Sequence, residues 1–133
     1  MTTPHSTIEL TEIIFPEHAN HYGTLFAGNA LKLMAKAAFL AGRRRAGCDV
    51  VVAGVNGVQF PAPVPVGHVL TLQTAVARVG RTSMTVDVDG WAEAPGAPRQ
   101  HVLKGSFELV AVDATGRPTP IDRPNTDPDQ ETA

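Results

Sequence analysis

One segment of the chain constrains the fold more than any other: residues 29–45 form an unbroken run of good helix formers. Asn29 is placed to cap the start of this predicted helix, and Gly47 follows its end, where helices often close with a left-handed residue. Apolar side chains make two stripes along it. They are Leu31, Met34, Ala38 and Ala41, and Leu33, Ala37 and Leu40. A helix that is apolar over most of its circumference must be covered on several sides.

The rest of the chain has the patterns of β-strands joined by turns. Valine-rich or alternating segments predict strands, and segments rich in proline and glycine separate them. The predicted strands cover residues 8–15, 50–60, 69–79, 84–91 and 102–112. Short turns between the last four strands favour antiparallel pairing, and the sheet must then curl around the helix to cover both stripes. We therefore predict an α+β fold with one antiparallel sheet wrapped around one long central helix.

The length of the chain bounds the number of domains. With 133 residues it is expected to form one domain, since domains usually run to about 100–200 residues. We predict a single domain over residues 1–121 and a flexible tail, rich in proline and aspartate, over residues 122–133. The outer face and edges of such a sheet need cover, so we also expect homo-oligomers.

Charge and cysteine content narrow the possible functions. The formal net charge of −2 gives no general attraction to phosphate backbones, so nucleic acid is not an expected partner, although residues 43–45 are three consecutive arginines. The only cysteine, Cys48, rules out an internal disulfide and is expected to be structural. The sequence shows no signal-peptide pattern and no membrane-spanning apolar run, so we expect a cytoplasmic protein without membrane insertion.

The loop between the first strand and the helix concentrates side chains that can do chemistry. They are Glu17, His18, Asn20, His21, Tyr22 and Thr24. His18 and His21 have the spacing of a metal-binding pair, but no third ligand is spaced nearby, so we predict no metal site. This loop is therefore the first place to look for catalytic or binding residues.

Several short motifs follow one another along residues 8–121. They are Phe15-Pro16 with Asn20, Gly23-Thr24-Leu25-Phe26-Ala27-Gly28, Leu31-Lys32-Leu33-Met34, Phe60 with Pro63-Val64, and Val79-Gly80-Arg81-Thr82-Ser83-Met84. In this order they resemble the acyl-CoA hydrolase branch of the hotdog-fold thioesterases. The resemblance implies a sheet wrapped around a helix and hydrolysis of an acyl-CoA to a free fatty acid and CoA, without a separate cofactor. It also implies a homodimer with shared sites, which in many members assembles as a trimer of dimers.

The resemblance implies catalytic roles at the start of the helix. Asn20 matches a loop asparagine that polarises the thioester carbonyl or holds a water from the opposite subunit. Gly28 would let the thioester approach closely, so that the backbone N–H groups of Gly28 and Asn29 stabilise the oxyanion.

Two groups of residues are candidates for binding the phosphates of CoA. Arg81, Thr82 and Ser83 lie in a predicted hairpin turn that resembles the CoA-contacting turn of the family. Arg43 belongs to the arginine run at the helix end and offers a planar fork of donors. The same arginine run would also serve as a solvated cap on the negative end of the helix dipole, so both interpretations stay open.

Four positions depart from the pattern of the family. The helix aspartate that activates water or attacks the thioester is Ala35 here, and Lys36 and Asn56 stand at two positions that are often acidic. Ala27 replaces a glycine before Gly28. An engineered knock-out would change Ala35 alone, so the joint departures favour natural divergence.

Three functions stay open from the sequence. The first is an acyl-CoA thioesterase that uses Glu17 or His18 as the base for a water held by Asn20. The second is a non-catalytic protein that binds acyl-CoA or CoA, and the third is a structural oligomer without a ligand.

Overall fold

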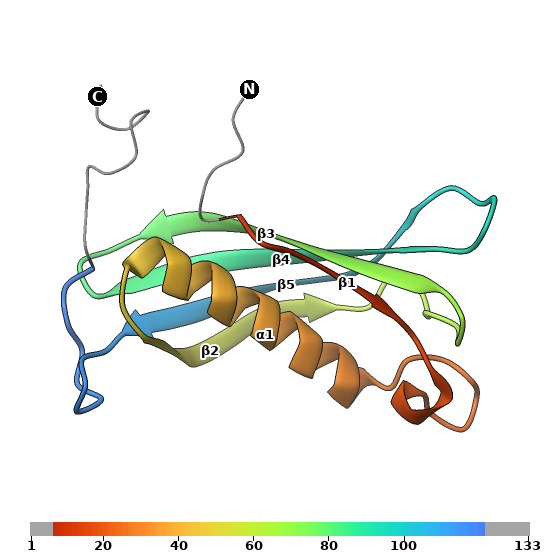
Figure 1. Ribbon diagram of the computed structural model, residues 1–133, viewed down its shortest axis with the longest axis horizontal. Coiled ribbons are helices and arrows are strands. Elements are labelled where there is room, and N and C mark those ends of the chain that lie inside the picture. The colour runs from red at the N-terminus through yellow and green to blue at the C-terminus, as the bar shows by residue number, and fades with distance from the viewer. Residues whose placement is uncertain (1–6, 122–133) are drawn as a thin grey trace.

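The computed structural model describes residues 7–121 and contains one long α-helix, one short 3-10 helix and five β-strands (Figure 1). In chain order these are β1 (Glu9–Ile13), η1 (Pro16–His18), α1 (Ala27–Ala46), β2 (Val50–Gln59), β3 (Val69–Val79), β4 (Ser83–Glu93) and β5 (Gln100–Ala111). The predicted helix and all five predicted strands are present; β3 has the predicted bounds, and the other elements have shifted ends. The tail predicted over residues 122–133 lies outside the described residues. Within residues 7–121, no helix combines the length and hydropathy needed to cross a membrane.

The start of α1 differs from the prediction. The helix begins at Ala27 with Phe26 at the N-cap position, so Asn29 lies inside its first turn. The Asn29 side chain donates to the carbonyl oxygen of His18 at 3.0 Å, which ties the helix to η1 and takes this side chain away from capping. At the other end Gly47 adopts a left-handed φ of 74° and closes the helix as predicted.

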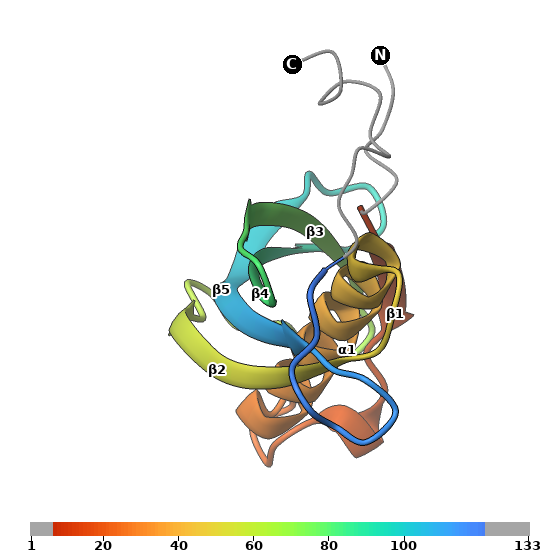
Figure 2. The ribbon, with the colours of Figure 1, turned by 90° about the vertical axis from the view of Figure 1, so that its left-hand side faces the viewer.

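The five strands form one antiparallel sheet in the order β1-β3-β4-β5-β2. β3, β4 and β5 follow one another as hairpins, whereas β2 leaves α1 and pairs with the far side of β5. Figure 2 shows the sheet curving around α1, which confirms the predicted α+β hotdog fold. As the last strand of the sheet, β2 has one edge without a partner strand among the described residues, and two register shifts interrupt its pairing with β5.

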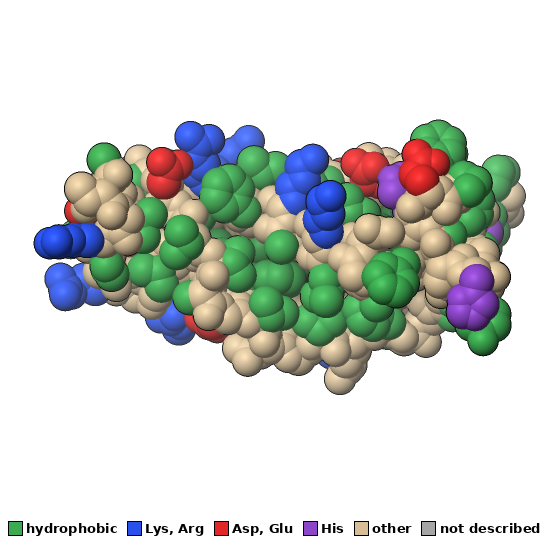
Figure 3. All heavy atoms as spheres, turned by 90° about the horizontal axis from the view of Figure 1, so that it is seen from below, with side chains coloured by type: hydrophobic (Ala, Val, Ile, Leu, Met, Phe, Trp, Pro, Cys, Tyr) green, Lys and Arg blue, Asp and Glu red, His purple; other side chains and the backbone are tan. Residues whose placement is uncertain are grey.

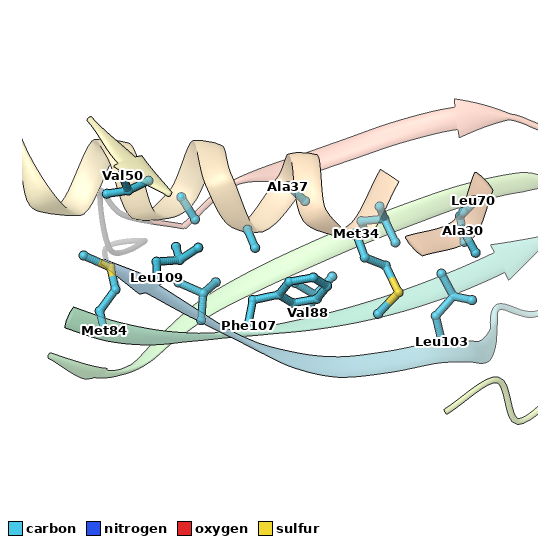
Figure 4. Packing of buried hydrophobic residues seen from close by; sticks show 14 of the residues in the cluster. Ala30, Met34, Ala37, Val50, Leu70, Met84, Val88, Leu103, Phe107 and Leu109 are labelled. Carbon is cyan, nitrogen blue, oxygen red and sulfur yellow. The ribbon is translucent and has the colours of Figure 1, made fainter. Parts of the chain in front are cut away.

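The core lies between α1 and the concave face of the sheet (Figure 4). The helix contributes mainly small residues, because Ala30, Ala37, Ala38 and Ala41 are all at most 1% exposed. Gly42 continues this pattern, since a Cβ there would clash with the Leu109 side chain of β5. The larger buried side chains come mostly from the strands and include Phe107, Leu70, Leu72, Met84, Leu103 and Leu109. Small helix residues therefore let the sheet close tightly around α1.

The convex face of β3, β4 and β5 is largely polar, which corrects in part the expectation that this face needs cover; Val51 of β2 is exposed apolar surface on the same face. Many of its polar side chains are bonded to one another across the strands. The contacts include Ser106 to Asp87 at 2.7 Å, His101 with Asp89 at 2.9 Å, and Thr85 and Arg78 to Glu108 at 2.9 and 3.3 Å. Paired polar groups tolerate contact with water, so no second layer is required on this face.

Uncovered apolar surface lies instead on one side of α1 and on β2. Leu31, Val51, Val52 and Val55 are 36–48% exposed, and we call these four residues the edge patch. Figure 3 shows apolar side chains gathered across this side of the molecule. An apolar strip beside an unpaired strand edge is typical of a surface that contacts another chain.

Candidate active site at the start of the long helix

Hydrogen bonds from separate parts of the chain hold the start of α1 in place. The carbonyl oxygen of His18 accepts from the Phe26 backbone N–H and from the Asn29 side chain, both at 3.0 Å. Leu25 donates to the carbonyl oxygen of Val64 at 2.8 Å, which ties the same loop to the segment before β3. The geometry of the helix start is thus set by the fold itself, without a ligand.

The first two backbone N–H groups of α1, those of Ala27 and Gly28, have no acceptor within residues 7–121. The next two, from Asn29 and Ala30, both donate to the carbonyl oxygen of Phe26. The Asn29 N–H predicted for the oxyanion site is therefore engaged, and the free N–H next to that of Gly28 is that of Ala27. Free N–H groups at the positive end of a helix form a ready site for a carbonyl oxygen that develops negative charge.

The ring of Phe26 covers the space that a side chain at Gly28 would fill. A Cβ on Gly28 would lie 2.8 Å from Cε2 of this ring. Phe26 is 53% exposed, so the ring is not locked into the core. A group that approaches Gly28 from its Cβ side would contact this ring. Residue order alone does not tell which neighbour fills the space beside a glycine, so sequence analysis missed Phe26.

The side chain of Asn20 is largely occupied by its own loop. Its Oδ1 accepts from the backbone N–H groups of Tyr22 at 2.9 Å and Thr24 at 3.1 Å. Its Nδ2 donates to the Thr24 hydroxyl at 3.1 Å. One of the two Nδ2 protons is left without an acceptor within residues 7–121. Asn20 can therefore offer one hydrogen bond as a donor, but its oxygen is already engaged.

Ala35 lies on the same flank of α1 as Gly28 and Leu31, because these positions are spaced i, i+3 and i+7. It is half-buried and packs against the core. Neither α1 nor β2 contains an aspartate or glutamate. These two elements therefore bring no carboxylate to the helix start.

Two other positions that depart from the family pattern point away from this flank. Asn56 is paired in register with Ser106, whose hydroxyl bonds to Asp87 on the convex face. Cross-strand partners share a face of the sheet, so Asn56 points away from α1. Lys36 is exposed and lies about 100° around the helix from Ala35.

His18 has a defined tautomer. Its Nδ1 accepts a hydrogen bond from the Phe15 backbone N–H at 3.0 Å, and a backbone N–H can only donate. The neutral ring must therefore carry its proton on Nε2, which makes this atom a donor. Glu17, the other predicted base, is exposed on η1. Within residues 7–121 no group of three or more histidine, cysteine, aspartate or glutamate side chains is arranged to hold a metal ion.

The predicted CoA-binding residues lie at the other end of α1. Arg43 follows Gly28 by fifteen residues, which separates them by about 22 Å along the helix axis. The turn at residues 81–83 joins β3 to β4 at the same end as Arg43 (Figure 1). We call Arg43, Arg44, Arg45 and this turn the basic end. One protomer places these residues at the same end of the molecule, away from the free N–H groups of α1.

Most polar groups at the basic end already have protein contacts. Arg43 Nε donates to Asp49 Oδ1 at 3.0 Å, and the Ser83 hydroxyl accepts from Arg78 at 3.2 Å. The side chain of Arg81 is exposed to solvent. A cleft of about 770 Å³ opens here between β1 and α1, and its lining includes Leu10, Leu40, Arg43 and Cys48. The half-buried Cys48 packs against the core, in agreement with its predicted structural role.

Comparisons with known proteins find close similarity in sequence and in fold. A sequence model of the thioesterase superfamily matches residues 22–98. An uncharacterised acyl-CoA thioester hydrolase of Zymomonas mobilis is 34% identical over 110 residues, which are 82% of this chain and 74% of that protein. A hexameric acyl-CoA thioesterase, solved without ligand, is similar with a TM-score of 0.86 and 31% identity over 96% of this chain and 83% of that one.

An acyl-CoA hydrolase of Staphylococcus aureus, solved with butyryl-CoA, CoA and CoA disulfide, is similar with a TM-score of 0.84. The identity is 25%, over 96% of this chain and 79% of that one. Three other structures of the same hydrolase each carry one substitution by alanine, of an asparagine, an aspartate or a threonine. In that protein the aspartate follows the asparagine by fifteen positions, and the threonine follows it by thirty-two. The same intervals counted from Asn20 lead to Ala35 and Val52, two apolar residues.

Proposed function

The chain belongs to the thioesterase superfamily, and from this membership we propose that it hydrolyses acyl-CoA thioesters to a free fatty acid and CoA. One observation carries the proposal: the free N–H groups of Ala27 and Gly28 stand at the start of a largely buried helix, where Gly28 was expected to serve the oxyanion. The names of the relatives support the substrate class. CoA is part of the substrate, and the proposal includes no separate cofactor and no metal.

In the proposed reaction, a water oxygen attacks the thioester carbonyl carbon, and negative charge develops on the carbonyl oxygen. The N–H groups of Ala27 and Gly28 stabilise this charge. Asn20 adds a third hydrogen bond through its remaining Nδ2 proton. Because Oδ1 of Asn20 is occupied, polarisation of the carbonyl is favoured over holding the water. The C–S bond then breaks, CoA leaves as a thiolate, and the proton released by the water ends on CoA or on solvent.

We propose that turnover is slow, because the site lacks the family's carboxylate. A positioned general base is typically worth about 10² to 10⁴-fold in rate. Glu17 stays the candidate base. The Nε2–H of His18 can donate a hydrogen bond to the leaving thiolate, but Nδ1 is already engaged and the ring has no free nitrogen to take a proton from water.

We further propose that the minimal unit is a homodimer joined through β2. A two-fold axis at the edge of β2 would pair this strand with the same strand of a second copy and bury the edge patch. The two copies of α1 would then run in opposite directions. The basic end of one copy would approach the helix start of the other, so one CoA molecule would reach both.

Three such dimers are the proposed full assembly, and two similar proteins are described as hexameric. We keep the cytoplasm as the proposed compartment. The support within the chain is its single cysteine, which lies half-buried and unpaired at the edge of the core.

A second candidate function is binding of acyl-CoA without hydrolysis. The specific observation in its favour is that Ala35 and Val52 are both apolar where the S. aureus hydrolase has the aspartate and threonine that its variants replace. Such a protein would keep the free N–H groups and lose only the step that activates water.

Release of free thiol distinguishes these functions. Purified protein is incubated with a series of acyl-CoAs and a thiol-reactive dye, and the Asn20→Ala variant serves as the control. Thiol that appears at a rate proportional to wild-type protein, and more slowly with the variant, supports hydrolysis. Calorimetric heat on adding acyl-CoA without thiol release supports the binding protein. No heat at millimolar CoA or acyl-CoA and no thiol release would leave only a structural oligomer.

The dimer is tested by a charge in the edge patch. Val55→Lys should shift the protein to a smaller species in light scattering, because the new charge would be buried between two copies. Ser106→Lys, on the convex face, is the matched control and should leave the mass unchanged. Equal masses for wild type and Val55→Lys would contradict pairing through β2.

A further inference from the structure

Asn20 and Thr24 are joined by their backbones and by their side chains. The Asn20 N–H donates to the carbonyl oxygen of Thr24 at 2.8 Å, and the Thr24 N–H donates to Asn20 Oδ1 at 3.1 Å. Between the side chains, Nδ2 of Asn20 donates to Oγ1 of Thr24 at 3.1 Å, and the Thr24 hydroxyl can donate in turn to Oδ1 at the longer distance of 3.3 Å. The two residues thus close a small ring of hydrogen bonds next to the start of α1.

These bonds fix the direction of the Asn20 amide. Oδ1 faces two backbone N–H groups, which can only donate, so the oxygen and nitrogen of this amide cannot be exchanged. One Nδ2 proton points at the Thr24 hydroxyl. The other lies on the opposite side of the planar amino group and therefore points out of the ring.

We propose that Thr24 is a positioning residue for thioester hydrolysis. Its hydroxyl takes one Nδ2 proton of Asn20 and thereby directs the other toward the carbonyl oxygen of the substrate. The inference rests on the proposed function and gives Thr24 no contact with the substrate. Without the hydroxyl, the two backbone bonds would still hold Oδ1, but no described contact would fix the amino group, so the plane of the amide could tilt about its oxygen.

Backbone contacts separate this role from simple support of the loop. Thr24 is bridged to Pro65, Val66 donates to the carbonyl oxygen of Gly23 at 3.0 Å, and Leu25 donates to Val64. None of these contacts uses the hydroxyl. Loss of the hydroxyl should therefore change the orientation of Asn20 and leave the loop in place.

The test compares Thr24→Val, which keeps the shape and removes the hydroxyl, with Thr24→Ser, which keeps the hydroxyl. Thr24→Val should lower kcat about tenfold with KM changed less than about threefold, and Thr24→Ser should recover most of the loss. In an Asn20→Ala background, Thr24→Val should have no further effect on kcat, because it acts through Asn20. An unchanged kcat in Thr24→Val, or the same loss in both backgrounds, would overturn the proposal.

A second measurement does not depend on turnover. In an NMR spectrum of the side-chain amides, a non-hydrolysable ketone analogue of acyl-CoA, which keeps the carbonyl oxygen and places a methylene between it and the sulfur, should shift one Nδ2 proton of Asn20 in wild type and not in Thr24→Val. A shift in wild type without thiol release would overturn hydrolysis and retain Thr24 as a positioning residue for the ligand. No shift in wild type, or equal shifts in both proteins, would overturn the role of Thr24.

Discussion

The two ends of α1 differ in whether charged side chains compensate the helix dipole. At the C-terminal end, Arg43, Arg44 and Arg45 oppose the partial negative charge, and Gly47 closes the last turn. At the N-terminal end, the first turn holds no acidic residue and the N-cap residue Phe26 makes no side-chain capping bond. The basic end is therefore stabilised in the usual way, whereas the helix start keeps its positive charge and its free donors.

This difference shows that the N-terminal end of α1 lacks the stabilisation that a capping side chain would give. A serine, threonine or aspartate at the N-cap is typically worth about 1 kcal/mol relative to an uncapped helix. Leaving Ala27 and Gly28 without acceptors forgoes that gain and leaves both donors free for a reaction. Changes at the helix start should consequently alter kcat, and changes at the basic end should alter KM.

The largest effect is expected from Asn20→Asp. The new carboxylate keeps the Oδ1 bonds to the loop but cannot donate a hydrogen bond, so kcat should fall about 10²-fold, as for loss of one oxyanion donor. Steady-state kinetics measure the loss, and thermal unfolding shows whether the loop survives. Gln100→Glu, at an exposed position at the start of β5, is the control and should change neither. Full activity in Asn20→Asp would make Asn20 a structural residue of the loop.

Ala35→Asp should raise kcat at least about tenfold, because it restores a general base on the flank of Gly28. The isosteric Ala35→Asn variant adds a polar side chain of the same shape without a base and should not gain. Both are assayed by thiol release at saturating acyl-CoA. Equal rates in the two variants would show that activation of water takes place elsewhere.

Supplying a cap at the helix start would reverse the asymmetry between the two ends. Relative to Phe26→Ala, Phe26→Ser should raise the free energy of unfolding by about 1 kcal/mol, because its hydroxyl can accept from a first-turn N–H group. The same bond should reduce kcat several-fold by competing with the substrate. Denaturant unfolding and kinetics are measured on both variants. A gain in stability without any loss of kcat would show that the free N–H groups do not contribute to catalysis.

Arg81→Ala should act at the basic end alone. If this exposed guanidinium binds a phosphate of CoA as proposed, its removal should raise KM for acyl-CoA about fivefold, in line with the modest strength of exposed charge pairs, and leave kcat unchanged. The effect should shrink as salt is added. Arg99→Ala, on the hairpin between β4 and β5, is the matched control. A loss confined to kcat would contradict the division between the two ends.

The smallest effect concerns the turn after β5, where hydrogen bonds lower the pKa of Asp113 below its usual value. The Thr115 hydroxyl contributes most, followed by the backbone N–H of Arg117. Since the folded pKa is depressed, this carboxylate stabilises the fold above the unfolded pKa of about 3.9, and the contribution is lost as pH falls through the folded value. Asp113→Asn should therefore lose slightly less stability than wild type on acidification, measured by denaturant unfolding.

The architecture could be predicted from the sequence because the apolar stripes of residues 29–45 admit few solutions. The expected boundaries of β3 were met, and the helix began two residues early because Asn29 bonds to His18 instead of capping. The site was harder to predict. The bonds from Tyr22 and Thr24 to the Asn20 side-chain oxygen were only weakly predictable from the sequence, since asparagine often bonds to the backbone two residues on. The contact between Phe26 and Gly28 has none.

The irregular pairing of β2 bears on how large an aggregate of this chain can grow. A long, flat, regular outer strand would accept neighbours in many alignments and could recruit copies without end. Here the shifts between Val52 and Gly54 and between Asn56 and Gln59 bend the strand at fixed points. A strand edge bent in this way can pair with the same edge of a second copy in few registers, and after pairing it has no free backbone groups for a third copy. In the proposed dimer the two β2 edges cover each other, so growth through this edge would stop at two chains and the exposed valine-rich edge would be protected from fibre formation.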